Sequence, residues 1–420
     1  MKFSPSVRRA TISVLAGMAA TGLIMSLSAC GGGQSAGSNK TTITFLSWDN
    51  EEKFRPFLDA FEKENPDITV DFSYSPPTNE YVSTLQMRLV GNQAPDVFVM
   101  TTENKKDVID NGYALDITNE EFMKDIAQAN KDFLSKDGKT YGMSVSGWEV
   151  GIAYNKDLLP QVGADTIPET WDEFISLCKK LKDAGITPYY EEPSGFATVN
   201  GFLGAMYAQN PDLKNGDTIA TGEHTFSEEW NPAVEQWARL WTEGVVSQDV
   251  VALTGDDIKS QFISGQVAMY QAGPWDLGDL DESGINYGFD LYPAMKEGLE
   301  RYGAGNSSPG YVIYSKTEGK KLEAAKKFLE FLKSDTALKM MEANGDLITV
   351  QSFNATPSEK LKSVYENGIK PGKYYQAQSH VPDANAFSNT IAPLVQEVAQ
   401  GKITPKDLTK QLDEKLPTWK

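Results

Sequence analysis

The chain has 420 residues, of which 39 are lysine or arginine and 58 are aspartate or glutamate, giving a net charge of −19. This acidic balance disfavours a phosphate backbone, and basic residues do not cluster with aromatic ones, so we expect no nucleic acid partner. Two cysteines and two histidines, His224 and His380, do not form the spacing of a metal site, and the sequence predicts no metal and no cofactor.

The first forty residues predict an export signal and a lipid anchor. A basic start is followed by a stretch without charge from Ala10 to Asn39. This stretch includes Leu27-Ser28-Ala29-Cys30, which resembles the lipobox of bacterial lipoproteins, so residues 1–29 are the expected signal peptide and Cys30 the lipidated residue. Residues 30–40 are the expected flexible tether. The alternatives are an ordinary secretory peptide and a membrane-spanning helix, but Ser26–Ala29 are small or apolar, Gly31–Gly33 follow at once, and no basic cluster comes after the apolar stretch.

The chain after the signal is longer than one hydrophobic core normally supports, so two domains are expected. Thr41–Phe45 alternates as a strand, and Phe54, Phe57, Leu58 and Phe61 then follow at helical spacing. Residues 68–72 alternate as a second strand, and residues 97–100 are typical of a short buried one. This β-α-β-α-β order favours an α/β fold with a parallel sheet and helices on both faces.

Further helices are predicted from capping residues and apolar spacing. Thr170 and Glu173 form a capping box ahead of one helix, and Pro232 is expected to open another that ends at Gly244. Helical spacing also appears in residues 322–332, 391–398 and 408–412. The same spacing indicates core packing, rather than ligand contact, for Cys178, Trp171, Trp237 and Trp241.

Two loops follow predicted strands at the edge where α/β sheets bind ligands. They are Trp48–Asn50 and Thr101–Asn104. Both combine apolar or aromatic residues with hydrogen-bonding side chains. Sugars need such a combination, because they present C–H faces for stacking and hydroxyl groups for pairing.

Three segments resemble the bacterial extracellular solute-binding proteins of family 1, the maltose-binding-protein-like family. They are Ala94-Pro95-Asp96-Val97-Phe98, residues 153–159 leading to Thr170–Phe174, and Gly273-Pro274-Trp275. Residues 285–293 continue the similarity, which spans nearly all of residues 41–420.

This resemblance implies the type II periplasmic-binding-protein-like fold, in which parallel-rich sheets flanked by helices form two lobes around a ligand cleft. The implied N-terminal lobe is residues 41–151 plus 307–355, and the implied C-terminal lobe is 152–306 plus 356–420. Crossing segments are expected near residues 146–154, 302–310 and 352–358.

The ligand-binding positions of the family are carried over residue by residue. Met100 and Asn104 stand where the family pattern has a tryptophan and an arginine, so one stacking platform and one cation are absent, and Trp148 supplies a replacement ring. A chain with 58 acids has many solvated carboxylates, so each acidic residue among the implied ligand-binding residues has exposure on the surface as its alternative explanation. Likewise, the glycine-rich turn before Tyr311 needs no ligand to explain it. The implied ligand-binding residues are Trp48, Asp49, Asn50, Glu103, Asn104, Trp148, Glu149, Glu192, Ser194, Trp275, Asp276, Ser308 and Tyr311.

The resemblance implies a substrate-binding lipoprotein of an ABC transporter. It would act as a monomer at the extracellular face of the cytoplasmic membrane, deliver a neutral oligosaccharide to ABC permease subunits, and have no enzymatic activity. An acid-rich cleft is expected to repel sialylated, sulfated and uronic ligands. The alternatives are a binding protein for a polyol or another non-sugar solute, a glycosidase with two carboxylates, and a surface adhesin or sensory lipoprotein.

Overall fold

The computed structural model describes residues 40–419. The predicted signal peptide, the lipidated Cys30 and the tether lie outside the described residues, apart from Lys40. No helix within the described range is both long and apolar enough to cross a membrane.

The first sheet has four strands in the order β11-β3-β1-β2. Its strands are β1 (Thr41–Ser47), β2 (Ile68–Tyr74), β3 (Val97–Met100) and β11 (Gly310–Ile313). β1 pairs in parallel with β2 and with β3, as predicted, whereas β11 returns antiparallel to β3. The helices α1 (Glu51–Glu64), α2 (Thr78–Val90) and α3 (Thr102–Asp110) each begin shortly after one of the parallel strands. The three β–α loops therefore meet at one edge of this sheet.

The second sheet is built around one long strand, β6 (Ser146–Asn155). The path is β13-β10-β6-β8-β7, with β9 and β12 also paired to β6. Pairing is antiparallel along β6 and parallel for β7–β8 and β10–β13, so this sheet is mixed rather than parallel-rich. Its other strands are β7 (Thr187–Tyr190), β8 (Val267–Ala272), β9 (Tyr287–Asp290), β10 (Gly303–Ser307), β12 (Leu347–Ile348) and β13 (Tyr374–Tyr375). A hairpin of β4 (Ser135–Lys136) and β5 (Lys139–Thr140) stands apart.

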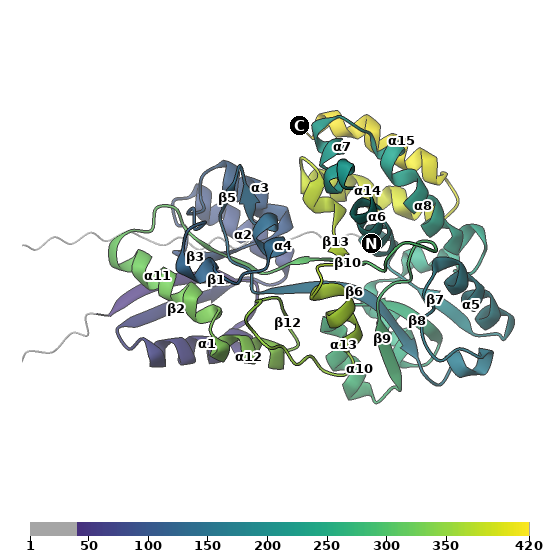
Figure 1. The fold of residues 1–420 in the computed structure, drawn as a ribbon, viewed down its shortest axis with the longest axis horizontal. Coiled ribbons are helices and arrows are strands. Elements are labelled where there is room, and N and C mark those ends of the chain that lie inside the picture. Colours follow the sequence, from purple (N-terminus) through teal and green to yellow (C-terminus); the bar gives the residue numbers. More distant parts are fainter. Residues whose placement is uncertain (1–39, 420) are drawn as a thin grey trace, which may run out of the picture. The chain divides into compact units, whose positions relative to one another are not determined.

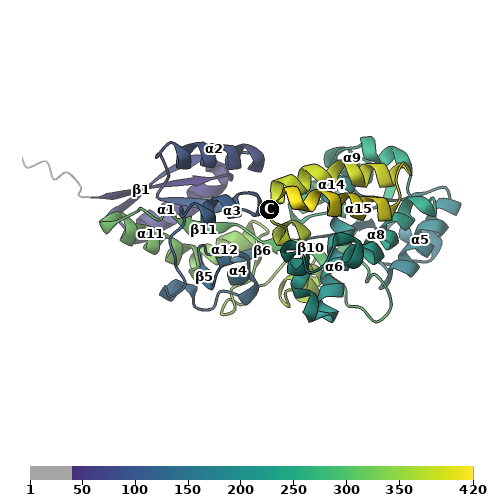
Figure 2. The same cartoon turned by 90° about the horizontal axis from the view of Figure 1, so that it is seen from above.

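The remaining helices cover these sheets, and Figure 2 shows α14 and α15 lying side by side. The capping box at Thr170 and Glu173 is present as predicted. The helix expected to open at Pro232 instead begins at Phe226, because Thr225 and Glu228 form an earlier capping box. The bounds are α4 (Gln128–Phe133), α5 (Trp171–Asp183), α6 (Ala197–Gln209), α7 (Asp217–Thr221), α8 (Phe226–Thr242), α9 (Gly255–Ile263), α10 (Leu277–Ser283), α11 (Gly319–Leu332), α12 (Asp335–Ala343), α13 (Lys362–Val364), α14 (Ala384–Ala399) and α15 (Pro405–Lys415).

Two separate hydrophobic cores accompany the two sheets. The first draws on residues 43–145 and 311–350, and the second on residues 150–304 and 361–419 together with Leu347. Trp171, Trp237 and Cys178 are fully buried in the second core, as their helical spacing predicts. Figure 1 shows β6 and β10 running between the two groups of elements. The lobe boundaries given above remain a prediction.

Candidate functional site

The β1–α1 loop carries three of the predicted ligand residues. Trp48 is half-buried, and its ring meets Tyr81 edge to face with centroids 5.6 Å apart. Asp49 forms an ion pair with Lys53 at 3.1 Å, and the Asn50 side chain accepts a hydrogen bond from the Lys53 backbone nitrogen at 2.9 Å. The polar groups of this loop therefore hold the start of α1 and remain near the surface.

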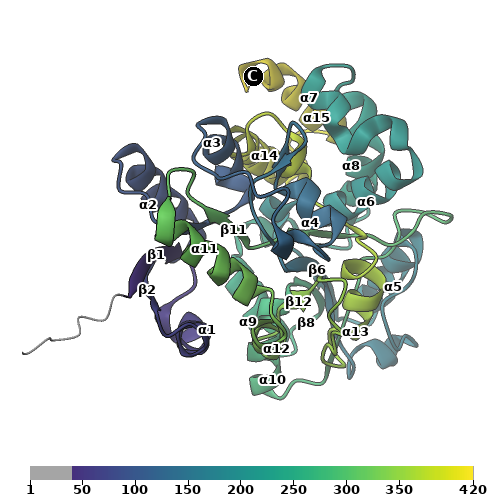
Figure 3. The same cartoon turned by 60° about the vertical axis from the view of Figure 1, so that its left-hand side comes forward.

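The β3–α3 loop carries two more predicted residues, of which one is buried and the other is partly exposed. Asn104 is 5% exposed, because its side chain accepts from the Thr101 backbone nitrogen at 2.8 Å and donates to the Val99 carbonyl at 3.3 Å. Glu103 is only half-buried, and Asn385 at the start of α14 donates to its backbone carbonyl. Figure 3 shows α3 and α14 as neighbours. Asn104 is thus committed to capping α3, while the Glu103 carboxylate forms no ion pair or hydrogen bond with the rest of residues 40–419.

Two tryptophans form an aromatic corner on the second sheet. Trp148 on β6 and Trp275 after β8 have ring centroids 6.0 Å apart and ring planes 60° apart. Trp275 is 63% exposed, a large apolar area to leave in water. Its indole lies directly on Gly273, where a Cβ would collide with the ring. Asp276 accepts from the Gly273 nitrogen at 3.0 Å and pairs with Lys259, so it braces the turn that presents Trp275.

Polar side chains lie on β8 and on the turn that follows β7. The Ser194 hydroxyl donates to the exposed Glu192 carboxylate at 2.7 Å. Gln271 on β8 has its amide nitrogen beside Gly195, while its buried amide oxygen has no hydrogen-bond partner within the described residues. No sequence motif indicates Gln271. The only sequence signal for it is its position two residues before Gly273, because residues two apart on a strand face the same side.

Glu149 is enclosed within the protein. It is 0% exposed, neither carboxylate oxygen has a hydrogen-bond partner in the described chain, and a Cβ on Gly303 or Gly368 would collide with it. Burial raises the pKa of Glu149 well above its usual range, and the nearby Gly303 backbone and Arg301 oppose that shift only in part. This placement gives no support to the prediction that Glu149 contacts a ligand.

An ionic cluster lies beside Trp148. Because Leu347 of β12 pairs with Gly147 of β6, Asp346 falls next to Trp148. Burial raises the pKa of Asp346 while Lys53 opposes that shift. Burial disfavours the charge of Lys53 too, but Asp346 and Asp49 outweigh it and the pKa of Lys53 is raised. Neither Asp346 nor Lys53 was predicted from the sequence.

The last two predicted residues lie near β11. Tyr311 is 3% exposed and packs near Phe45 in the first core, and its pKa is raised by burial and by the nearby Asp49 and Asp346. Ser308 is half-buried and its carbonyl accepts from the Ser146 hydroxyl at 2.9 Å. The Tyr311 ring is therefore mainly a core residue, whereas Ser308 keeps a partly open side chain.

An amide network joins α3 to the second sheet. Asn306 of β10, paired in register with Trp148, directs its amide nitrogen at Thr102, Gln376 and Ser379, at 3.3, 2.8 and 2.8 Å. Thr102 also donates to Gln376 at 3.1 Å. These contacts join residues far apart in sequence, so no local pattern predicts them.

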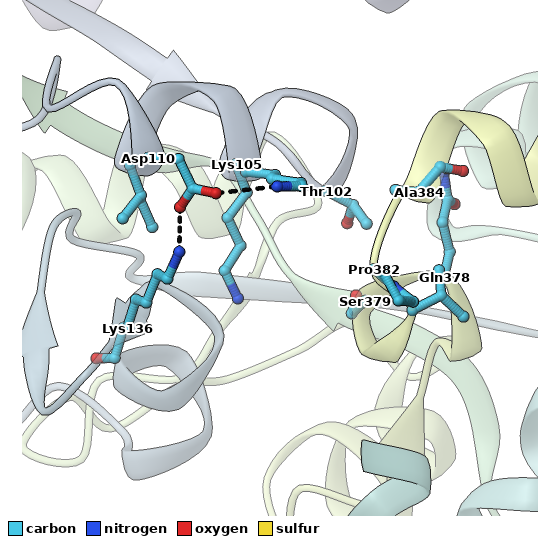
Figure 4. A pocket seen from close by; sticks show the side chains of 12 residues that line it. Thr102, Lys105, Asp110, Lys136, Gln378, Ser379, Pro382 and Ala384 are labelled. Carbon is cyan, nitrogen blue, oxygen red and sulfur yellow. Dashed lines mark hydrogen bonds and ion pairs between the residues drawn. The ribbon is translucent and has the colours of Figure 1, made fainter. Parts of the chain in front are cut away.

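A groove opens on the far side of Thr102, and we call it the lysine groove. It has a volume of about 270 Å³ and lies between α3 with β4 on one side and residues 378–384 on the other. In Figure 4 the side chain of Lys105 extends into the groove, and Asp110 meets Lys136. Burial lowers the pKa of Lys105. The main polar lining residues are Thr102, Lys105, Lys106, Lys136, Gln378 and Ser379.

No group of three or more histidine, cysteine, aspartate or glutamate side chains in the described range could hold a metal ion. Residues 47–339 match the family described as bacterial extracellular solute-binding protein, and the chain belongs to this family. The predicted family and the two-lobe solute-binding fold are thereby confirmed.

Similar proteins are known in both sequence and structure. A family 1 extracellular solute-binding protein from Bifidobacterium longum subsp. infantis is 36% identical, with a TM-score of 0.82 over 90% of this chain and 100% of that one. The melibiose/raffinose/stachyose-binding protein MelE of Bacillus subtilis is 23% identical over 394 residues, 90% of each chain. A sugar transporter from Bacillus licheniformis in complex with stachyose is 19% identical, with a TM-score of 0.67 over 90% of this chain and 100% of that one, and shares the fold.

Proposed function

We propose that this chain is the substrate-binding lipoprotein of an ABC importer and that it captures a neutral oligosaccharide between its lobes. The proposed lobes are residues 41–151 plus 307–355 and residues 152–306 plus 356–420. The observation that carries the proposal is the aromatic corner of Trp148 and Trp275, one ring of which is largely exposed and braced from below.

The chemistry of the corner suits a sugar ring. An indole face stacks on the apolar C–H face of a pyranose, and groups at the ring edge pair with its hydroxyls. Gln271 of β8 lies beside Gly195, next to the Glu192–Ser194 pair, and Asp346 falls next to Trp148 in the strand register. A hydrogen bond to a charged carboxylate contributes about 1.5–3 kcal/mol, enough to select the stereochemistry of a hydroxyl.

The relatives support a sugar rather than a polyol as the ligand. The names of MelE and of the galactooligosaccharide-binding protein and maltodextrin-binding protein MdxE of Bacillus subtilis all specify oligosaccharides. The lipobox-like segment supports a lipid on Cys30 and a place at the outer face of the cytoplasmic membrane. As a binding protein, the chain would act as a monomer without catalysis and pass its ligand to membrane permeases.

Transport requires that the ligand change the relation between the lobes. A ligand shifts an open–closed equilibrium only by its difference in affinity for the two states. Groups from both cores flank Trp148, so a bound sugar would touch both lobes and favour the closed state.

The test is a thermal-shift panel of raffinose, stachyose, maltotriose, a galactooligosaccharide and a polyol. A ligand at one hundred times its Kd should stabilise the protein by about 2.7 kcal/mol. We expect a neutral oligosaccharide to raise the Tm of the wild type and of Met87→Ala, an exposed control on α2, but not that of Trp275→Ala. A response to the polyol alone would contradict the proposal.

A further inference from the structure

The lysine groove differs in charge from the rest of this acidic chain. Its lining contains Lys105, Lys106 and Lys136 against a single acid, Asp110. By contrast, the cavity beside β12 contains Glu342 and Asp346 and no basic residue. In a chain with a net charge of −19, the groove is a local region of positive charge.

The single acid of the groove is already shared by two of the lysines. Asp110 accepts from Lys106 at 3.0 Å and also pairs with Lys136. These two contacts lower the pKa of Asp110, with the Lys136 hydrogen bond contributing most. No carboxylate of the groove is left for Lys105.

Lys105 is half-buried and has no anionic partner in the part of the chain that the structure describes. Its ammonium lies 5.2 Å from the centroid of the Phe133 ring, and it forms no ion pair or hydrogen bond within residues 40–419. Asp217 attracts it from a distance without pairing, since Asp217 is bonded to His380 at 3.1 Å. The Lys105 ammonium has three hydrogen-bond donors, and a bound anion would replace water as their acceptor and add a charge–charge attraction.

The groove adjoins the proposed sugar site. Thr102 lines the groove and also contacts Asn306, which is paired in register with Trp148. A volume of about 270 Å³ can hold a carboxylate or sulfate group together with the sugar unit that carries it.

We propose that the lysine groove binds an oxyanion, a carboxylate or a sulfate, with Lys105 as its direct partner and Lys106 and Lys136 adding attraction. This inference rests on the proposed function and adds to it an anion site beside the neutral sugar units, open to a free anion or to an acidic terminal unit of a longer ligand. It reverses the expectation that sulfated and uronic ligands are excluded, because that expectation counted the acids of the cleft and not the lysines beside it.

The experiment measures Tm and calorimetric binding for the full chain with sodium sulfate, sodium glucuronate and a glucuronate-terminated oligosaccharide, each against sodium chloride of equal ionic strength. Three variants are compared with the wild type. Lys105→Met keeps the aliphatic stem without the charge, Lys105→Arg keeps the charge, and Lys63→Met removes an exposed lysine of α1.

We expect saturable binding of glucuronate or sulfate to the wild type and to Lys63→Met, at least about tenfold weaker binding to Lys105→Met, and retained binding to Lys105→Arg. Tighter binding of the acidic oligosaccharide than of free glucuronate would place the anion on the sugar, whereas equal binding would assign the groove to a free anion. Equal responses of wild type and Lys105→Met, or an equal effect of sodium chloride, would overturn the proposal.

The neutral panel separates this inference from the proposed function. If neutral oligosaccharides bind Lys105→Met as they bind the wild type while anions do not, both proposals stand. If no neutral sugar binds but the Lys105-dependent anion response persists, the sugar proposal fails and the anion site remains.

Discussion

Trp148 and Glu149 are adjacent on β6, so their side chains leave the strand on opposite faces. The resemblance to known solute-binding proteins placed both residues at the ligand. A strand can present only one of them to a given cleft. Trp148 meets Trp275, while Glu149 is sealed beneath Gly303 and Gly368. The alternation of the strand was thus a constraint available from the sequence that would have separated the two.

The buried carboxyl of Glu149 gives a prediction about pH. Its folded pKa is raised, whereas an unfolded glutamate titrates near a pKa of about 4.3. Between these values the folded state keeps a proton that the unfolded state has released, so stability falls as pH rises above about 4.3. Glu149→Gln, which stays neutral, should gain stability relative to the wild type as pH rises, by up to about 1.4 kcal/mol per pH unit.

Urea unfolding at several pH values measures this difference. Glu297→Gln, an exposed acid with no ion pair among the described residues, is the control and should follow the wild type at every pH. A constant offset between Glu149→Gln and wild type across the series would show that Glu149 is ionised in the folded protein.

At the scale of elements, helix starts explain one confirmed helix and one correction, and they also bear on Asn104. The Thr170 and Glu173 pair was recognised as a capping box because its spacing is local. The same logic applied to Thr225 and Glu228 would have moved the start of α8 ahead of Pro232. At α3, Thr101 and Asn104 form a capping box with an asparagine in the third helical position. These capping hydrogen bonds occupy the Asn104 side chain.

The capping of α3 predicts how Asn104→Ala will behave. The substitution removes hydrogen bonds to the Thr101 nitrogen and the Val99 carbonyl, both buried. We expect it to lower the free energy of unfolding by about 1–2 kcal/mol while changing sugar affinity little. Asp107→Ala, on an exposed position of the same helix, should change neither quantity. An affinity loss larger than the stability loss, from chemical denaturation and calorimetry, would restore Asn104 as a ligand contact.

The first sheet and most helices followed from periodicity, because strands and helices joined by short loops depend on local sequence. The pairing of the second sheet cannot be predicted from local sequence, because β6 pairs with four strands drawn from residues 267–348. All four pairs are antiparallel. The aromatic corner came from family motifs. Gln271, Asp346, Asn306 and Lys105 were missed, because each acquires its role only from a residue distant in the chain.

At the scale of the whole molecule, a set of polar contacts connects α3 of the first core with residues of the second. The amide of Asn306 is central to them, since it contacts Thr102 of α3 as well as Gln376 and Ser379. These bonds favour the arrangement of lobes seen here.

Asn306→Ala should therefore loosen this arrangement in the absence of ligand. We expect a larger radius of gyration in small-angle scattering and a several-fold change in the Kd for sugar, corresponding to about 1 kcal/mol. Asn286→Ala, which removes a hydrogen bond to Asp157 at 2.7 Å that does not involve α3, is the matched control. Superimposable scattering profiles for Asn306→Ala and wild type, with and without ligand, would show that the network does not control the lobes.

The first core is built from two distant parts of the sequence, and this has a consequence for the order of folding. The first core takes β11 as an edge strand, and Phe328 of α11 packs on Phe45 and Phe61 with ring centroids 5.3 and 5.1 Å apart. During synthesis, residues 43–145 emerge long before residues 311–350. A growing chain shorter than about 310 residues thus lacks strand β11 and helices α11 and α12 of its first core. The first core is complete only once residue 350 has been made and the second only once residue 419 has, so both lobes finish folding late in synthesis.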